Sequence, residues 1–463
     1  MGNRFDVVVV GARCAGAPLA AMLASRGIGV TVVEKAAFPR DTPSTHVFEA
    51  DALTFLSRLG LTKQLLLTGA PLINRADSRI DDLRWSAPWP TRLGEVGGVM
   101  SVRRFVLDPI LVQAAEQAGA EVRMATKVTA LVQEGGRVVG VRTDSEVGRK
   151  ELRARLVVGA DGRNSTVARL TGARRYNVVP NKRALFWGFF ENARMGEPTF
   201  VFHRWADRMV QACPTDRGLY QVGVFVELAQ LDCFRSGVDT HFFEHANSCE
   251  PVAIALAGAE RVGKLRAMVR WEGFFREASG PGWVLTGDAG HFKDPAPGRG
   301  IGDAFLQADR LAPAIASALK GNDKAVDKAM SHWARWRDKE FAEHYWFAND
   351  LGATGPLPEV LQGVLRNLHT QGNASLALEI SNHRLKPSQL LTPARLLRAM
   401  ASALAQRGGH RLEILREVRG LLTQELHRRR LRWWPDYGST APSGRAVIET
   451  KKVVGAPRHE LAK

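Results

Sequence analysis

The sequence predicts an α/β protein with a doubly wound, Rossmann-like domain, an inserted mixed β-sheet domain and a helical C-terminal extension. Three observations support this fold class. Residues 5–34 read as a buried strand, a glycine-rich turn, a helix and a second strand, which is how nucleotide-binding folds begin. Residues 180–275 hold longer strands rich in Phe and Trp. Beyond residue 311 the apolar pattern is helical.

Bulk composition is that of a globular protein with several domains. The chain has 463 residues, of which 45% are hydrophobic and 24% charged, enough for two or three substantial cores. The apolar run at residues 7–10 is too short to span a membrane and no cleavage site follows it, so we expect a cytoplasmic protein. The four cysteines lie far apart without a Cys-x-x-Cys pair, and we therefore expect no disulfide framework and no metal site.

Positive charge is concentrated near the C-terminus. The formal net charge is +17, and residues 391–463 hold 15 Lys and Arg against 6 Asp and Glu. We interpret this as a basic appendage and expect no nucleic-acid partner, because a nucleic-acid surface would interleave the charge with aromatic residues. Residues 411–432 form a candidate amphipathic helix with apolar residues at 415, 418, 422 and 426. This helix either packs on the body with a solvated basic face or makes a peripheral contact with an anionic membrane.

The turn at residues 11–16 and the acid that follows it carry the pattern of a dinucleotide site. Gly11 and Gly16 permit a tight turn and a close approach of phosphate, and the next helix presents its N-terminus to that charge. Glu34 closes the second strand, where a carboxylate accepts hydrogen bonds from an adenosine ribose. The turn departs from G-x-G-x-x-G at Arg13, whose side chain either points away from the phosphates or reaches round to them.

Two further junctions between a strand and a turn follow along the chain. A buried strand ends at Asp161-Gly162, and a short strand at residues 283–286 ends at Gly287-Asp288. The second junction continues through a loop rich in Pro and Gly into a helix that begins near Gly302. Glycines at 298, 300 and 302 let the backbone approach a flat or charged group, and the helix N-terminus suits an anion or an electron-poor ring.

Two other segments hold candidate site residues, each with two open interpretations. Thr45 and His46 precede a helix over residues 49–59, where they either face a cofactor ring or substrate, or act as a capping hydroxyl and a surface histidine. Arg103 and Arg104 open a helix within residues 101–119. A double arginine at this place either forms a solvated face or holds a pyrophosphate.

These patterns divide the chain into five parts. Residues 1–175 and 280–330 are expected to form the first and second parts of the nucleotide-binding domain. Residues 176–279 are expected to form a β-sheet substrate-binding domain, whose aromatic strands either cover an apolar cavity or make an ordinary core. Residues 331–435 are expected to be helical and residues 436–463 to be a disordered tail.

The three turns, in this order, resemble those of the FAD-dependent oxidoreductases that share the p-hydroxybenzoate hydroxylase fold. That family contains class A flavoprotein monooxygenases, geranylgeranyl reductases and flavin-dependent halogenases, and the resemblance covers about residues 5–350. It implies an FAD-binding domain in which the pyrophosphate and adenosine ribose are held by Gly11, Ala12, Gly16, Glu34 and Lys35. It also implies a second group at the ribityl chain, phosphates and flavin ring: Arg104, Asp161, Gly287, Asp288, Gly300, Ile301 and Gly302.

The resemblance leaves the reaction open between two main classes. The expected function is that of a monooxygenase, which reduces FAD with NADPH or NADH and hydroxylates an apolar or aromatic small molecule with O2 through a flavin C4a-hydroperoxide. The alternative is a geranylgeranyl-reductase-like enzyme that passes a hydride to an alkene. Gly302 slightly favours the reductase alternative, because aromatic hydroxylases commonly carry Asn at the position of Gly302.

Two further classes and the electron donor complete the expectations. A halogenase is disfavoured because the sequence has no Trp-x-Trp-x-Ile motif. A flavin-binding protein without catalytic activity is a third alternative. The sequence shows no second glycine-rich nucleotide site, so NAD(P)H would visit the FAD domain transiently or a separate reductase would supply the electrons.

Overall fold

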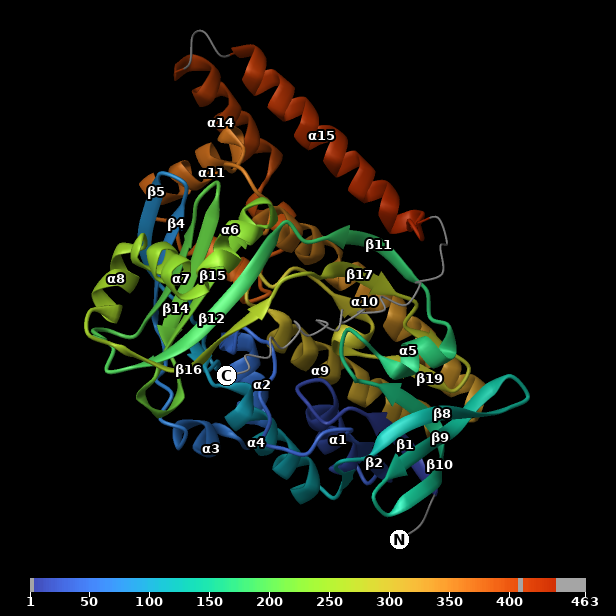
Figure 1. The fold of residues 1–463 in the computed structure, drawn as a ribbon. Helices are drawn as coiled ribbons and strands as arrows, with labels where there is room; N and C mark the ends of the chain where they lie inside the picture. The colour runs from blue at the N-terminus through green and yellow to red at the C-terminus, as the bar shows by residue number, and fades with distance from the viewer. Residues whose placement is uncertain (1–3, 407–410, 439–463) are drawn as a thin grey trace, which may run out of the picture.

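The computed structural model describes residues 4–406 and 411–438. Within them the chain forms a mainly parallel sheet, a second mixed sheet and a helical C-terminal region that lies against the mixed sheet (Figure 1). This arrangement confirms the predicted class, an α/β protein with a Rossmann-like domain, an inserted mixed sheet and a helical extension. The tail expected at 436–463 lies outside the described residues, except for residues 436–438.

The main path of the first sheet runs in the order β18-β19-β10-β1-β2-β7, and the four pairs from β19 to β7 are parallel. Its strands are β1 (Arg4–Val10), β2 (Val30–Val33), β7 (Glu121–Arg123), β10 (Gly148–Gly159), β18 (Ser279–Gly280) and β19 (Trp283–Leu285). Val7 and Val9 of β1 are buried in one core, and Val8 and Val10 are buried in another on the opposite face. Burial on both faces explains why β1 reads as a continuous apolar run.

Helices cover one face of this sheet, and a hairpin with a short helix covers the other. The first face packs on α1 (Gly16–Ala24), α4 (Arg104–Gln117) and α9 (Gly300–Ala318). The second face packs on β8 (Lys127–Glu134), β9 (Arg137–Ser145) and α5 (Thr166–Thr171). β8, β9 and the first half of β10 form an antiparallel meander.

The mixed sheet has the order β16-β12-β15-β14-β13-β4-β5. Its strands are β4 (Arg75–Ile80), β5 (Leu83–Pro88), β12 (Arg183–Glu191), β13 (Thr199–Arg204), β14 (Arg208–Pro214), β15 (Tyr220–Glu227) and β16 (Glu260–Met268). β13 pairs with β4 in parallel, and the other neighbours are antiparallel. Residues 75–88 therefore join a sheet whose other strands come from residues 183–268. The division of the chain into five parts stays a prediction.

The two faces of the mixed sheet have different partners. Phe186 and Phe190 point into a core with α6 (Leu231–Ser236), α7 (Val238–Asn247) and α8 (Glu250–Leu256). Trp187 and Phe225 point to the opposite face and pack against the strands and loop that precede α9. The remaining short elements are α2 (Ala50–Arg58), α3 (Thr62–Leu66), β3 (Val47–Glu49), β6 (Val99–Ser101), β11 (Arg175–Pro180), β17 (Glu272–Arg276) and β20 (His291–Phe292).

The described part of the C-terminal region is helical, as predicted. It contains α10 (Asp323–Leu351), α11 (Glu359–Thr370), α12 (Leu376–Ser381), α13 (Pro387–Leu390), α14 (Pro393–Gln406) and α15 (Arg411–Trp433). Two buried arginines of the mixed sheet hold the end of α10: Arg204 donates to the carbonyl of Leu351, and Arg183 and Arg204 both donate to the carbonyl of Ala353. Their positive charge complements the negative end of the helix dipole.

The face by which α15 packs on the body differs from the row of apolar residues seen in the sequence. Ile414 is buried, whereas Leu415, Leu422 and Leu426 are exposed and only Val418 of the expected row is partly covered. The sequence obscured this because α15 carries apolar residues on two faces, and periodicity alone does not show which face meets the body.

Candidate functional site

Three turns identified in the sequence meet at one edge of the parallel sheet. Gly11 follows β1, Glu34 follows β2, Asp161 follows β10 and Gly287-Asp288 follow β19. These four strands are parallel neighbours, so their carboxyl ends lie side by side. Ligands of open α/β sheets bind at this edge, outside the carboxyl ends of the strands.

The turn between β1 and α1 requires its two glycines. Gly11 has a φ of +103°, and a Cβ atom there would lie 2.5 Å from the carbonyl oxygen of Ala160. A Cβ atom on Gly16 would lie 1.8 Å from the carbonyl oxygen of Gly11. Neither position accepts a side chain without a backbone shift, and the turn delivers the N-terminus of α1 to the sheet edge, where it favours negative charge.

Glu34 is fixed by backbone donors from two segments. The Ala12 N–H donates to Oε2 and the Ala36 N–H donates to Oε1, both at 3.0 Å. The side chain is buried and oriented, yet each carboxylate oxygen keeps a second lone pair for a hydroxyl donor. Lys35, the next residue, is exposed, so the structure does not gather it with the other candidates.

Arg13 points toward α4. Its Nη1 lies 3.2 Å from Oδ2 of Asp108, and its guanidinium carbon lies 5.0 Å from the ring centre of Phe38. Arg104 donates to both oxygens of the same carboxylate, at 2.6 and 3.1 Å. Two guanidinium groups therefore share one buried carboxylate, which leaves a surplus positive charge beside the glycine turn. Such a surplus suits a phosphate group.

Asp288 is the free acceptor of this site. Burial raises its pKa to about 6, and the charge of Arg104 works in the opposite direction. Among the described residues, no side chain or amide donates a hydrogen bond to it. Because a half-buried carboxylate is stabilised when it accepts hydrogen bonds, this residue fits a ligand that brings hydroxyl groups to the edge of the sheet.

Asp161 has a local structural role that accounts for its carboxylate. Ser165 Oγ donates to it at 2.5 Å and the Thr166 N–H donates at 2.6 Å. It therefore helps to cap α5, together with Ser165, which accepts from the Ala168 N–H. Its assignment to the cofactor stays a prediction.

The N-terminus of α9 opens toward the same edge. Gly298 has a φ of +75°, and a Cβ atom added to the exposed Gly300 would meet nothing within 4 Å. The first amides of α9, at Gly300, Ile301 and Gly302, have no partner one turn earlier in the helix. A Cβ atom on Gly302, by contrast, would lie 2.7 Å from the guanidinium of Arg299. The Arg299 side chain thus fills the space that an Asn side chain would need.

A buried charge cluster, which the sequence did not predict, supports this helix from behind. Arg299 donates to Glu49 at 2.9 Å and to both oxygens of Asp51 at 2.7 and 2.8 Å. Lys293 Nζ lies 2.6 Å from Oδ2 of Asp303. Burial raises the pKa of Glu49 to about 8. The partners come from α2, β3 and α9, so only the fold brings them together.

Thr45 and His46 lie between the two sheets. His46 is buried with a φ of +60°, and its Nδ1 accepts the Arg104 N–H at 3.0 Å. Burial, with Arg104 and Arg103, lowers its pKa to about 3. Its ring meets Phe189 of β12 edge-on, with ring centres 5.4 Å apart. His46 is therefore a neutral, buried side chain at the junction of the two sheets. The alternative interpretation of His46 as a surface histidine is wrong.

Two glutamines of the mixed sheet hold the loops of this junction. Gln221 Nε2 donates to the carbonyl of Thr45 at 2.6 Å, and Gln211 Nε2 donates to the carbonyl of Ala296. The hydroxyl of Thr45 lies 3.4 Å from the carbonyl oxygen of Gly298. Apolar residues of the same sheet face pack with Ala296 of the loop before α9: Leu185, Trp187, Met209 and Phe225.

Residues 4–406 and 411–438 contain no group of three or more His, Cys, Asp or Glu side chains that could hold a metal ion. In the same part of the chain, no helix is long and apolar enough to cross a membrane.

Comparisons with known proteins agree with this geometry. A family model described as an FAD binding domain matches residues 4–222. The chain is 29% identical over 380 residues to menaquinone reductase of Mycolicibacterium smegmatis, covering 78% of this chain and 87% of that protein. It is 27% identical over 354 residues to digeranylgeranylglycerophospholipid reductase of Methanosarcina mazei (73% and 82% covered). It is 26% identical over 321 residues to rifampicin monooxygenase of Streptomyces venezuelae (68% and 65%).

Solved structures share the fold at lower identity. The flavin-dependent brominase Bmp2 aligns with a TM-score of 0.72 and 19% identity, covering 87% of this chain and 100% of that one. The myxobacterial chondrochloren halogenase CndH aligns with a TM-score of 0.67 and 22% identity, covering 86% and 97%. These likenesses and the three turns at one sheet edge show an FAD binding domain over residues 4–222, in a chain that is similar to FAD-dependent reductases, monooxygenases and halogenases.

Proposed function

We propose that the residues at the sheet edge hold FAD in the way that the turns suggest. The amides from Gly11 to Gly16 and the guanidinium of Arg104 would bind the pyrophosphate, and Glu34 would bind the adenosine ribose. Asp288 would accept from the ribityl chain, and the first amides of α9 would face the flavin ring. Bound FAD would supply hydride exchange and oxygen activation, which amino-acid side chains do not provide.

We infer that this enzyme is a monooxygenase that uses NADPH or NADH and O2 to hydroxylate an apolar or aromatic small molecule. The observation that carries the proposal is the apolar core between the mixed sheet and the loop before α9, which contains Trp187, Met209 and Phe225. An apolar face excludes water from the reacting atoms and accepts a substrate without charges. NAD(P)H would visit the FAD domain without a glycine-rich site of its own.

His46 would act in this site as a fixed hydrogen-bond donor. Because its Nδ1 accepts the Arg104 N–H, the ring hydrogen of the neutral imidazole is on Nε2. With a pKa lowered to about 3, the ring stays neutral between pH 5 and pH 8. His46 therefore orients a partner and does not deliver a proton by its own titration in that range.

The test is to follow oxygen from labelled O2 into product. The purified holoenzyme, reduced by NADPH or NADH, is mixed with ¹⁸O2 and a panel of apolar aromatic compounds, and the products are analysed by mass. Incorporation of one labelled oxygen per NAD(P)H consumed is the expected result. Reoxidation that never labels a product, for any compound that the enzyme binds, would overturn the monooxygenase proposal.

The second candidate function is that of a flavin-dependent alkene reductase. Two observations favour it: Gly302 with Arg299 replaces the Asn of aromatic hydroxylases, and two similar proteins are reductases of menaquinone and of a digeranylgeranyl lipid. The test is anaerobic reoxidation of the reduced enzyme by a menaquinone or a polyprenyl alkene. A product in which one isoprenoid double bond is saturated, formed without O2, would select this function over hydroxylation; reduction of the quinone ring alone would not.

A further inference from the structure

Helix α15 carries a second apolar face that the body does not cover. Its packed face contains Ile414 and Leu431, which are 3% and 7% exposed. A separate row is formed by Leu412, Leu415, Leu422, Leu426 and Trp433, which are 50% to 79% exposed. Steps of three, four and seven residues place all five on one side of an α-helix. We call these five residues the apolar row.

Exposed apolar side chains are normal on protein surfaces when they are scattered. The apolar row differs because its exposed side chains lie together. Sixteen large hydrophobic residues of the described chain are exposed, and six of them are the apolar row and the adjacent Trp434. These six lie within 23 consecutive residues at one edge of the molecule, where α15 runs along the outside of the helical region (Figure 1).

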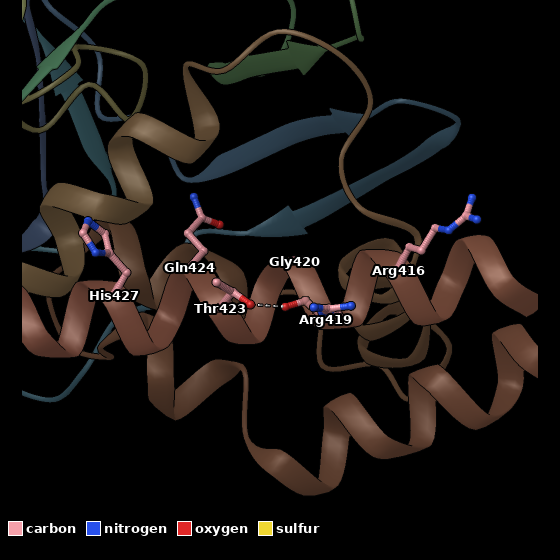
Figure 2. A pocket seen from close by; sticks show the side chains of 6 residues that line it. All are labelled: Arg416, Arg419, Gly420, Thr423, Gln424 and His427. Carbon is pink, nitrogen blue, oxygen red and sulfur yellow. Dashed lines mark hydrogen bonds between the residues drawn. The ribbon is translucent and has the colours of Figure 1, made fainter.

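Arginines lie within and beside the apolar row. Arg419 falls inside it by helical spacing, and Arg416 and Arg430 lie on its flank; within the described residues none of these three forms an ion pair. Arg416 and Arg419 also line a shallow hollow on the adjoining polar side of α15, together with Thr423, Gln424 and His427 (Figure 2). A face of Leu and Trp bordered by unpaired Arg is typical of helices that lie in the interface of an anionic membrane.

Other charges of α15 hold the helix on the body instead. Arg428 pairs with Asp350 of α10, with nitrogen to oxygen distances of 2.8 and 2.5 Å, and Arg432 donates to Glu343 at 3.2 Å. The helix is therefore anchored through its packed face, and the apolar row remains presented outward. A preorganised face loses less conformational freedom on binding.

We propose that the apolar row of α15 docks on the surface of a bilayer rich in anionic phospholipids. The leucines and Trp433 would enter the interfacial layer, and Arg416, Arg419 and Arg430 would reach the lipid phosphates. Because the long arginine stem lies along apolar surface while its charge stays at the polar boundary, Arg419 fits within the row at a membrane. The described helices do not cross a bilayer, so this contact is peripheral and is independent of the reaction catalysed.

A second copy of the chain fits the same face less well. Pairing two apolar rows would place Arg419 between leucines in an interface without an acid in the row to pair with it. Burying an uncompensated guanidinium is costly, whereas lipid phosphates supply the missing negative charge. The composition of the row thus favours an anionic lipid surface over self-association.

The experiment is vesicle cosedimentation of the full-length holoenzyme. Vesicles of phosphatidylglycerol and phosphatidylcholine are compared with vesicles of phosphatidylcholine alone, at low and high salt. The variant Leu422→Glu/Leu426→Glu is expected to lower binding to the anionic vesicles at least about tenfold. The matched control, Leu66→Glu/Leu67→Glu, changes two leucines that are 61% and 77% exposed near α3, and it should bind like the wild type.

A second variant separates charge from apolar contact. Arg416→Gln/Arg419→Gln is expected to weaken binding to anionic vesicles and to reduce its dependence on salt. Equal binding of the leucine variant and the wild type would overturn the proposal. If, in addition, the leucine variant sediments more slowly than the wild type in sedimentation velocity, the row would be assigned to contact with a second copy of the chain. Flavin content and thermal unfolding of each variant exclude loss of folding as the cause.

Discussion

The two loops that meet at the sheet edge are built in different ways. The turn at Gly11–Gly16 depends on local backbone geometry, because each glycine lies against the backbone of the turn itself or of the neighbouring strand. The loop before α9 depends on charge, because Arg299 is held by Glu49 and Asp51, about 250 residues earlier in the chain. One loop is specified by its own residues, and the other is specified by its partners.

This difference indicates which kind of substitution disrupts each loop. A turn made of close backbone contacts fails when any atom is added. A loop held by buried ion pairs fails when a charge is removed, since the remaining charges lose their compensation. Four substitutions, from the largest expected effect to the smallest, test this contrast.

The largest effect is expected for Gly16→Ala. Its Cβ atom would lie 1.8 Å from the carbonyl oxygen of Gly11 and 3.1 Å from Cγ1 of Val9, so the turn must move and we expect loss of flavin and of stable folding. The control is Gly420→Ala in α15, where a Cβ atom meets nothing within 4 Å and alanine should stabilise the helix by about 0.5–1 kcal/mol. Flavin absorbance per protein and thermal unfolding measure both. A yellow, stable Gly16→Ala protein would contradict the turn geometry.

Arg299→Met tests the loop held by charge. It leaves Glu49, Asp51 and Asp303 without their guanidinium partner, and breaking a buried ion pair of this kind costs about 3–5 kcal/mol of unfolding free energy. The control, Arg58→Met, breaks an exposed pair with Asp309 at 2.9 Å and should cost less than about 1 kcal/mol. Urea unfolding of the two variants gives the comparison. Similar losses of unfolding free energy in both variants would show that the buried cluster stabilises the protein no more than an exposed ion pair does.

Asp288→Ala tests the ligand side of the same edge. If Asp288 accepts from the ribityl chain, its removal deletes a charged hydrogen bond and should weaken flavin binding by about 1.5–3 kcal/mol with little change in folding. Asp288→Asn keeps one acceptor oxygen and should recover part of the affinity. Flavin release on dilution, followed by fluorescence, measures both variants. An alanine variant that retains flavin as tightly as the wild type would refute the assignment of this residue.

The sequence predicted the parts of the site that depend on local spacing. The glycine turn, Glu34 and the Gly287-Asp288 junction were placed correctly at the carboxyl ends of strands, because each follows a buried run and precedes a turn or helix. The pairing of Arg104 with Asp108 also had a local signal, since the two residues are four apart on a helix. The direction of Arg13 depended on the same carboxylate and was left open.

Long-range contacts account for what the sequence did not predict. His46 was given a surface position as one option, and its burial depends on Arg104 and Phe189 from distant segments. The strands at residues 75–88 gave no sign that they would pair beside β13. The packed face of α15 was not predicted, because the helix has apolar residues on two faces and one of these faces remains exposed. For His46 and for residues 75–88 the deciding partner is more than 50 residues away in the chain.

An effect that is smallest near pH 5 and grows as pH rises is expected for Glu49→Gln, which keeps the shape of the buried cluster and removes the titration of the Glu49 carboxyl group. Burial raises the pKa of Glu49 to about 8, above the ordinary value of 4.5. Between these two values the folded protein binds a proton that the unfolded chain has released. Stability of the wild type therefore falls as pH rises through this window, by up to about 1.4 kcal/mol per pH unit from this group. Glu49→Gln removes that decline, so the variant should match the wild type near pH 5 and exceed it increasingly toward pH 8. Unfolding free energies at pH 5, 6.5 and 8 measure the difference, and a difference that stays constant with pH would show that Glu49 is ionised beside Arg299 and that the loop is held by one more full charge.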